Sequence, residues 1–232
     1  MTALSIVIPT LNEAEEIVAM LTRIQSWRQR SVEVIVVDGG SHDGTPQRVV
    51  PWVDIVVTSA RGRALQMNTG ARHAQGELLL FLHADTWLPE DPNGNILALL
   101  TTSHHLWGWF RVDITGHHPL LRIVALLMNL RSCLTSIATG DQAIFVSRDQ
   151  FWQLGGFPEI PIMEDIAFCR LAKASLSSPL CIRTPVVTSG RRWQRHGIWT
   201  TIGLMWGMRL AYWLGVAPER LVRWYGDLRR GV

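Results

Sequence analysis

The sequence has very little lysine, and this shortage shapes its charge. Its 22 basic residues are 21 arginines and one lysine, Lys173, against 19 acidic residues. The basic residues are scattered and no nucleic-acid-binding module is recognisable, so we expect no nucleic acid partner. The planar guanidinium of arginine binds phosphate groups well, so the composition is compatible with a phosphate-bearing ligand.

Cysteine is also scarce, and a secretion signal is missing. Cys133, Cys169 and Cys181 are far apart, odd in number and without metal-site spacing, which predicts free thiols in a reducing compartment. No positively charged stretch or cleavage motif precedes the apolar run at residues 4–8, so we expect no signal peptide. Both features predict a cytoplasmic location.

The first hundred residues alternate between strand and helix patterns. Short apolar runs at 4–8, 32–37, 53–57 and 77–82 predict buried strands, and a stripe beginning at Ile17 and residues 62–74 predict helices between them. Asn12 and Glu15 have the spacing of a helix capping box. This order predicts βαβ units and a mostly parallel sheet. No G-x-G-x-x-G motif follows the first strand, so a dinucleotide site is not indicated.

The second half is less regular. We expect strands at 107–114 and 143–146, an apolar helix at 120–130, and a helix at 164–174 that begins with two acids. Chain length and a hydrophobic content of 47% suit one full core.

Acidic side chains follow three of the predicted strands. Glu13, Asp38 and Asp85 come just after the first, second and fourth strands, and Glu164 and Asp165 open the late helix. Strand ends of a parallel sheet meet at one edge, so the first three should share one cleft. Each group by itself is equally compatible with a turn or a helix start.

The motifs PTLNE (9–13), VDGGSHDGT (37–45), FLHADT (81–86) and MEDIAFCR (163–170) resemble those of the family 2 glycosyltransferases, which have the GT-A fold and use nucleotide-diphosphate sugars. The resemblance spans roughly residues 4–190, and residues 62–77 are similar to the subgroup labelled selenodomain-associated transferases. It implies a Rossmann-like α/β domain with a mostly parallel central sheet flanked by helices.

The resemblance also implies roles for individual residues. Asp165 matches the general base of inverting members, with Glu164 orienting the site. Asp85 matches the last acid of the metal-binding D-x-D motif, with Mn²⁺ or Mg²⁺ as the cofactor, and His83 replaces the first acid. Asp141 is a candidate for acceptor binding or a turn residue. The nucleotide-sugar contacts expected from the motifs are Pro9, Thr10, Glu13, Asp38 and Asp85. Arg63, Gln66 and Asn68, just after the third strand, are further candidates because their side chains can bind a phosphate or a base, and a solvated helix start is the alternative.

The C-terminal segment, residues 191–232, reads as a helical extension of a domain spanning 1–190. Residues 198–217 carry one charge, Arg209, while Trp199, Trp206 and Trp213 recur at helical spacing. The central arginine argues against a membrane span. A helix lying on the cytoplasmic membrane surface, packing on its own domain, and a homodimer contact all stay open.

The predicted function is an inverting, metal-assisted glycosyltransferase acting on an acceptor hydroxyl, and a membrane location would favour a lipid-linked acceptor. A nucleotidyltransferase is the first alternative, but residues 9–13 are acidic and glycine-free. A non-catalytic nucleotide-sugar-binding module is the second, because His83 stands where an acid is expected. The sequence determines neither the sugar and base of the donor nor the acceptor.

Overall fold

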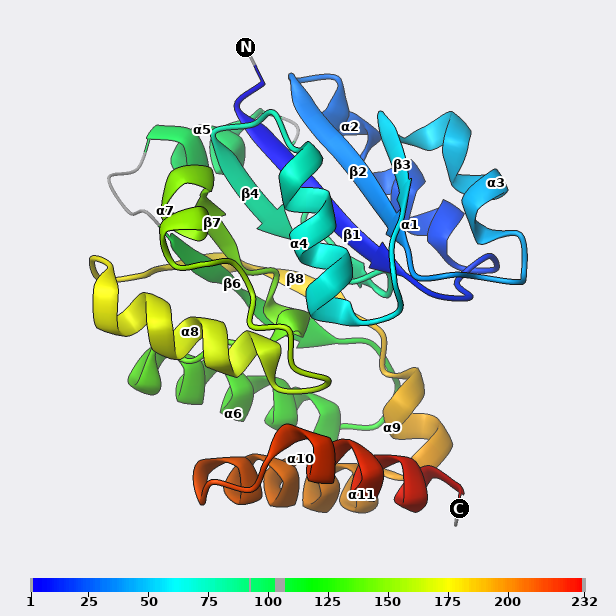
Figure 1. Cartoon of the computed structure of the whole chain (residues 1–232), viewed down its shortest axis with the longest axis vertical. Helices are drawn as coiled ribbons and strands as arrows, with labels where there is room; N and C mark the ends of the chain where they lie inside the picture. Colours follow the sequence, from blue (N-terminus) through cyan, green and yellow to red (C-terminus); the bar gives the residue numbers. More distant parts are fainter. Residues whose placement is uncertain (1, 92, 103–106, 231–232) are drawn as a thin grey trace.

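The computed structural model describes residues 2–91, 93–102 and 107–230. Within them, eight strands form one sheet in the order β3-β2-β1-β4-β7-β6-β8-β5, flanked by helices (Figure 1). The strands are β1 (Leu4–Thr10), β2 (Val32–Asp38), β3 (Ile55–Thr58), β4 (Leu78–Phe81), β5 (Thr86–Trp87), β6 (Trp107–Ile114), β7 (Phe145–Ser147) and β8 (Leu180–Thr188). The helices are α1 (Ile17–Arg23), α2 (Gln25–Arg28), α3 (Thr45–Val49), α4 (Arg63–His73), α5 (Asn95–Thr102), α6 (Leu120–Thr135), α7 (Arg148–Gln153), α8 (Glu164–Ser175), α9 (Arg191–His196), α10 (Ile198–Trp213) and α11 (Pro218–Arg230), with 3-10 turns η1 (Val50–Trp52) and η2 (Gly140–Gln142).

The first four strands are parallel, as the alternating pattern predicted. β1 lies between β2 and β4, and β3 pairs with the outer side of β2. In the register, Leu4 lies opposite Val32 and Thr10 opposite Asp38. The carboxyl ends of β1 and β2 therefore meet at the same edge of the sheet.

The predicted mostly parallel arrangement is confirmed, since β6 also runs parallel to β8, but the second half of the sheet adds two reversed strands. β7 runs antiparallel to β4 and β6, and β5 runs antiparallel to β8, so the sheet is mixed. The predictions overlooked β8, because Pro185 interrupts its apolar run and proline removes a ladder donor. The direction of a strand depends on the connections between strands, and the composition of the strand itself does not predict it.

Two apolar layers cover the faces of the sheet. Val7 packs with Met67 of α4 and Phe168 of α8 on one face, while Ile6 packs in the layer that contains Met128 of α6 on the other. Alternating side chains of a strand point to opposite faces, so a strand buried on both sides is apolar throughout. The three cysteines are free, as predicted.

The predicted capping box at Asn12 is wrong. α1 begins at Ile17, and Asn12 has a positive φ of 55°. Its side-chain oxygen accepts a hydrogen bond at 2.9 Å from the backbone nitrogen of His42, in the loop after β2. Asn12 thus joins two loops at the edge of the sheet.

The apolar tail is helical but shorter than its composition indicated. α10 ends at Trp213, Gly215 has a left-handed φ of 89°, and α11 starts at Pro218. In the part of the chain that the structure describes, no helix is long and apolar enough to cross a membrane. Met208 and Leu221 form an apolar cluster with Ile166, so the tail packs against α8. The boundary at residue 190 stays a prediction.

Candidate active site

The ends of β1 and β2 form a tightly bonded polar corner. Asp38 is buried, and its Oδ2 accepts hydrogen bonds from the backbone nitrogens of Gly40 (2.9 Å) and Ser41 (2.8 Å). The amide nitrogen of Gln66, from α4, donates to the carbonyls of Thr10 (2.7 Å) and Val37 (2.8 Å). The corner is held together by its own hydrogen bonds, which suits a preformed binding surface.

Several predicted nucleotide contacts belong to this corner. Pro9 pairs with Val37 in the sheet, and Thr10 is buried. Asn68 lies further along α4, where its amide exchanges two hydrogen bonds of 2.9 Å with the backbone of Phe157. The amides of Gln66 and Asn68 therefore hold the fold together, and their nucleotide contacts stay predictions.

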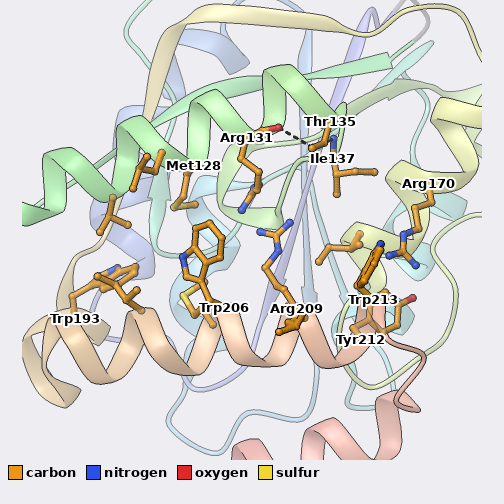
Figure 2. Close-up of a pocket in the computed structure, with 16 residues that line it drawn as sticks. Met128, Arg131, Thr135, Ile137, Arg170, Trp193, Trp206, Arg209, Tyr212 and Trp213 are labelled. Carbon is orange, nitrogen blue, oxygen red and sulfur yellow. Dashed lines mark hydrogen bonds between the residues drawn. The ribbon is translucent and has the colours of Figure 1, made fainter.

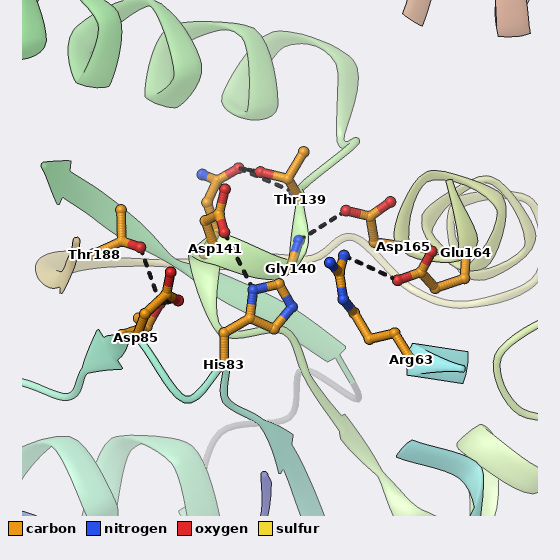
Figure 3. Close-up of polar contacts among 11 residues, drawn as sticks. Arg63, His83, Asp85, Thr139, Gly140, Asp141, Glu164, Asp165 and Thr188 are labelled. Atoms are coloured by element: carbon orange, nitrogen blue, oxygen red, sulfur yellow. Dashed lines mark hydrogen bonds and ion pairs between the residues drawn. The ribbon is translucent and has the colours of Figure 1, made fainter. Parts of the chain in front are cut away.

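A candidate metal-binding group lies beyond the end of β4. His83, Asp85 and Asp141 each offer a ligand atom, and these atoms lie within 4.8 Å of one another (Figure 3). His83 Nδ1 is 3.2 Å from Asp141 Oδ1. An imidazole and two carboxylates can hold a divalent ion, and the nitrogen ligand suits Mn²⁺ better than Mg²⁺. Asp141, expected at the acceptor, thus stands with Asp85.

The His83 ring is fixed by close packing. Its Nε2 is buried and has no hydrogen-bond partner among the described residues. A Cβ added to Gly140 would lie 2.3 Å from that atom, so only glycine leaves room for the ring. His83 therefore faces the acids through Nδ1.

Asp165 and Glu164 open α8 on the other side of Gly140. Asp165 Oδ2 accepts a 2.8 Å hydrogen bond from the Gly140 backbone nitrogen. Glu164 is 2% exposed, and its Oε1 lies 3.2 Å from Arg63 Nη1. Gly140 thus connects the candidate metal ligands to the candidate base.

Burial and neighbouring charges shift the pKa values of several groups in the site. Burial, then the neighbouring Asp165, raises the pKa of Glu164, and Arg63 opposes this shift. The Arg63 side chain is 48% exposed, and its partial burial lowers its pKa, but nearby carboxylates, Glu164 foremost, outweigh this effect and leave the pKa above its usual value. Burial, followed by Asp85, raises the pKa of Glu13. The charge of Glu13 therefore interacts with that of Asp85 in the candidate metal-binding group.

A cavity of about 130 Å³ adjoins these residues. It is lined by Arg63, His83, Asp141 and Asp165, and by Met208 and Arg209 of α10. The sequence named no candidate site residue in α10, although packing of residues 191–232 on their own domain was left open. The structure places α10 against it, and no local sequence signal reveals that contact.

The fold and the acidic sheet edge define an α/β protein with a polar, metal-suited cleft. Residues 5–117 match the family model described as "Glycosyl transferase family 2". Residues 5–117, just under half of the chain, are therefore similar to this family. Membership of the selenodomain-associated subgroup stays a prediction.

Two curated relatives and one solved structure are similar to this chain. Glycosyltransferase AglE of Haloferax volcanii is 33% identical over 90 residues, which cover 35% of this chain and 30% of that protein. Undecaprenyl-phosphate 4-deoxy-4-formamido-L-arabinose transferase of Aeromonas hydrophila subsp. hydrophila is 28% identical over 118 residues, covering 46% and 36% respectively. The mannosyltransferase PcManGT from Pyrobaculum calidifontis, in complex with GDP-Man and Mn²⁺, superposes with a TM-score of 0.60 at 27% identity over 80% of this chain and 56% of that one. The chain thus spans about a third of the length of the curated relatives it matches.

Proposed function

We propose that the protein transfers a sugar from a nucleotide-diphosphate donor to an acceptor hydroxyl, with inversion at the anomeric carbon and with a divalent metal ion. The observation that carries this proposal is the arrangement around Gly140, where His83, Asp85 and Asp141 adjoin Asp165. The similarity to PcManGT, whose complex contains GDP-Man and Mn²⁺, supports both the donor class and the metal.

The donor would occupy the edge formed by β1, β2 and β4. Thr10, Glu13 and Asp38 stand on the side proposed for the nucleoside, and Arg63 is proposed to bind the diphosphate. His83, Asp85 and Asp141 would hold the metal ion, which when bound supplies positive charge that stabilises the leaving diphosphate.

Asp165 is the proposed general base. Its hydrogen bond from Gly140 orients the carboxylate at the edge of the cavity. The carboxylate accepts the proton of the acceptor hydroxyl while that oxygen bonds to the anomeric carbon. The bond from that carbon to the diphosphate breaks, and its electrons leave with the diphosphate. Glu164 positions Arg63 through their ion pair.

A lipid-linked acceptor at a membrane surface is part of the proposal. The relative from Aeromonas hydrophila is an undecaprenyl-phosphate transferase by name. Trp199, Trp206 and Trp213 are 73%, 62% and 71% exposed along α10. Exposed tryptophans with nearby arginines suit the membrane interface, where the ring is amphipathic. A homodimer that covers the same tryptophans is the competing partner.

Donor hydrolysis tests the proposed activity. With Mn²⁺ and a panel of sugar nucleotides, we expect slow release of nucleoside diphosphate by the wild type. Asp85→Ala should abolish the release, and Glu90→Ala, which removes an exposed carboxylate from the same segment, should keep it. Binding of sugar nucleotides without any turnover would contradict the proposal and support a non-catalytic module. Formation of a sugar nucleotide from a nucleoside triphosphate would support a nucleotidyltransferase instead.

A further inference from the structure

A groove separates α6 from α10 on the face of the molecule that carries the exposed tryptophans. Its volume is about 340 Å³, which lies within the range of small-molecule sites. Most of its lining is apolar and includes Val124, Leu127, Met128, Met205, Trp206 and Leu210 (Figure 2). An elongated apolar group would therefore fit between the two helices.

Three arginines interrupt this apolar lining, and one of them, Arg170, lies over the ring of Tyr212 at 5.0 Å from its centroid. Arg131 extends from α6 and Arg209 from α10, and Figure 2 shows their guanidinium groups pointing toward one another. Arg131 Nη2 donates to Ser132 Oγ at 3.0 Å, but its Nε is buried and has no partner among the described residues. No carboxylate forms an ion pair with Arg131 or Arg209 within the described part of the chain.

The positive charges of Arg131 and Arg209 repel each other. Burial, and next the charge of Arg209, lowers the pKa of Arg131 to about 10. Burial also lowers the pKa of Arg209, and Asp165 partly offsets this. Facing cations in an apolar groove are relieved by an anion that both can bind.

The groove adjoins the candidate active site. Ile166, Met205 and Arg209 line both the groove and the smaller cavity that contains Asp165. A molecule bound along the groove would therefore reach the proposed base with its polar end.

We propose that this groove binds a lipid acceptor, with its apolar chain between α6 and α10 and its phosphate between Arg131 and Arg209. This inference rests on the proposed glycosyl transfer and specifies its acceptor. The acceptor hydroxyl lies beyond the phosphate, in the cavity beside Asp165. Arginine forks bind phosphate oxygens in pairs, which uses the unpartnered Nε of Arg131.

The charges favour this occupant over a second apolar protein surface. An apolar helix seated in the groove would bury Arg131 and Arg209 without any counter-charge. A lipid chain can enter from the open side, where Trp206 is 62% and Leu210 57% exposed. One molecule with an apolar chain and an anionic group satisfies both parts of the groove.

Isothermal titration of the full chain with three probes tests the site: decyl phosphate below its micelle concentration, decanol and inorganic phosphate. Decyl phosphate should bind at least about tenfold more tightly than either of the other two, because it alone matches both chain and charge. Arg209→Met should weaken decyl phosphate binding by about tenfold. Arg122→Met, on an exposed position of α6 outside the groove, should leave it unchanged. Arg131→Met is the second test. Among the described residues Arg209 donates no hydrogen bond, whereas Arg131 donates to Ser132 and Gln142, so a thermal melt checks that both variants fold.

The outcomes separate this inference from the proposed activity. Equal binding of decyl phosphate and inorganic phosphate would overturn the lipid groove, and equal binding of decyl phosphate and decanol would overturn the arginine site. If either occurs while the wild type still releases nucleoside diphosphate from a donor, the glycosyl transfer stands without this acceptor. If decyl phosphate binds as expected and no donor is ever turned over, the acceptor role falls together with the proposed activity.

Discussion

At the scale of single residues, Gly140 organises the candidate site by having no side chain. Its backbone nitrogen donates to Asp165, and its missing Cβ leaves space for the His83 ring. The sequence singled out Asp85 and Asp165 by their positions after a strand and at a helix start. It left Asp141 open between an acceptor contact and a turn residue, since nothing local shows that residue 141 returns to residues 83–85.

The role of Asp165 as a base can be tested against a matched acid. Asp165→Asn should lower transfer by about 10²- to 10⁴-fold and leave donor affinity unchanged, because the amide cannot accept the proton. Asp149→Asn is the control, since Asp149 is exposed in the first turn of α7 just as Asp165 stands in that of α8. Steady-state kinetics and donor titration measure both, and equal losses in the two variants would assign Asp165 a helix-capping role.

The pair of Arg63 and Glu164 predicts a pH-dependent stability. Because the folded pKa of Glu164 is raised above 4.5, the folded protein keeps a proton that the unfolded chain releases, and this contribution to stability is lost as pH rises from 4.5 through the raised pKa. Arg63→Met should steepen that loss, because it leaves the buried carboxylate unpaired.

We expect the free energy of unfolding of Arg63→Met to be lower than that of the wild type by about 1–2 kcal/mol at pH 7, a figure already reduced because the arginine is half-exposed. At pH 4 the loss should be smaller. Urea denaturation at both pH values measures it. Arg61→Met, an exposed neighbour, provides the baseline. A loss of stability that is the same at both pH values would contradict the assigned pairing.

At the scale of elements, α10 has two different sides. Met208 packs against the start of α8, while Trp199, Trp206 and Trp213 stay exposed. The seven-residue spacing of the tryptophans predicted a shared face, and their exposure agrees with it. The spacing did not show which elements α10 would contact, because that depends on how Gly197 and α9 direct the chain.

Two glycines of α10 provide a prediction for this helix. An added Cβ at Gly203 or Gly207 would meet no described atom within 4 Å. Each Gly→Ala substitution should therefore stabilise the protein by about 1 kcal/mol, since alanine is the better helix former. Thermal or urea denaturation measures the change. Destabilisation that depends on protein concentration would instead show that a second chain packs on these glycines.

At the scale of the whole molecule, most of the exposed large apolar side chains lie on the helices at one end. The groove lies between α6 and α10, and α6 adds exposed leucines to the tryptophans of α10: Leu126, Leu127, Leu130 and Leu134. Figure 1 shows α10 and α11 at the end of the molecule farthest from the N-terminus. Such a one-sided arrangement fits contact with a lipid surface.

Flotation with anionic vesicles tests this arrangement. We expect the wild type to float at low salt and to float less at high salt, since Arg220 and Arg223 are exposed on α11. Replacing Trp199, Trp206 and Trp213 together by alanine should abolish flotation. Trp152→Ala, which removes a partly exposed tryptophan from α7, should have no effect. A wild-type protein that stays at the bottom at low salt would remove the membrane surface from the proposal.

By itself, the sequence determined the parallel half of the sheet and the acids at its edge. Apolar runs such as 32–37 and 77–82 are local patterns, and Asp38 and Asp85 come soon after them, so chain order alone predicts that both lie at the same edge of the sheet. The four motifs likewise predicted the family that residues 5–117 match.

Only the tertiary structure decided the reversed direction of β7 and the pairing of β8. It also decided that Asp141 lies beside His83 and Asp85, and that a groove lies between α6 and α10. These features join residues that are distant along the chain. They depend on how the elements pack and on the paths of the segments between them, and the local amino-acid composition predicts neither.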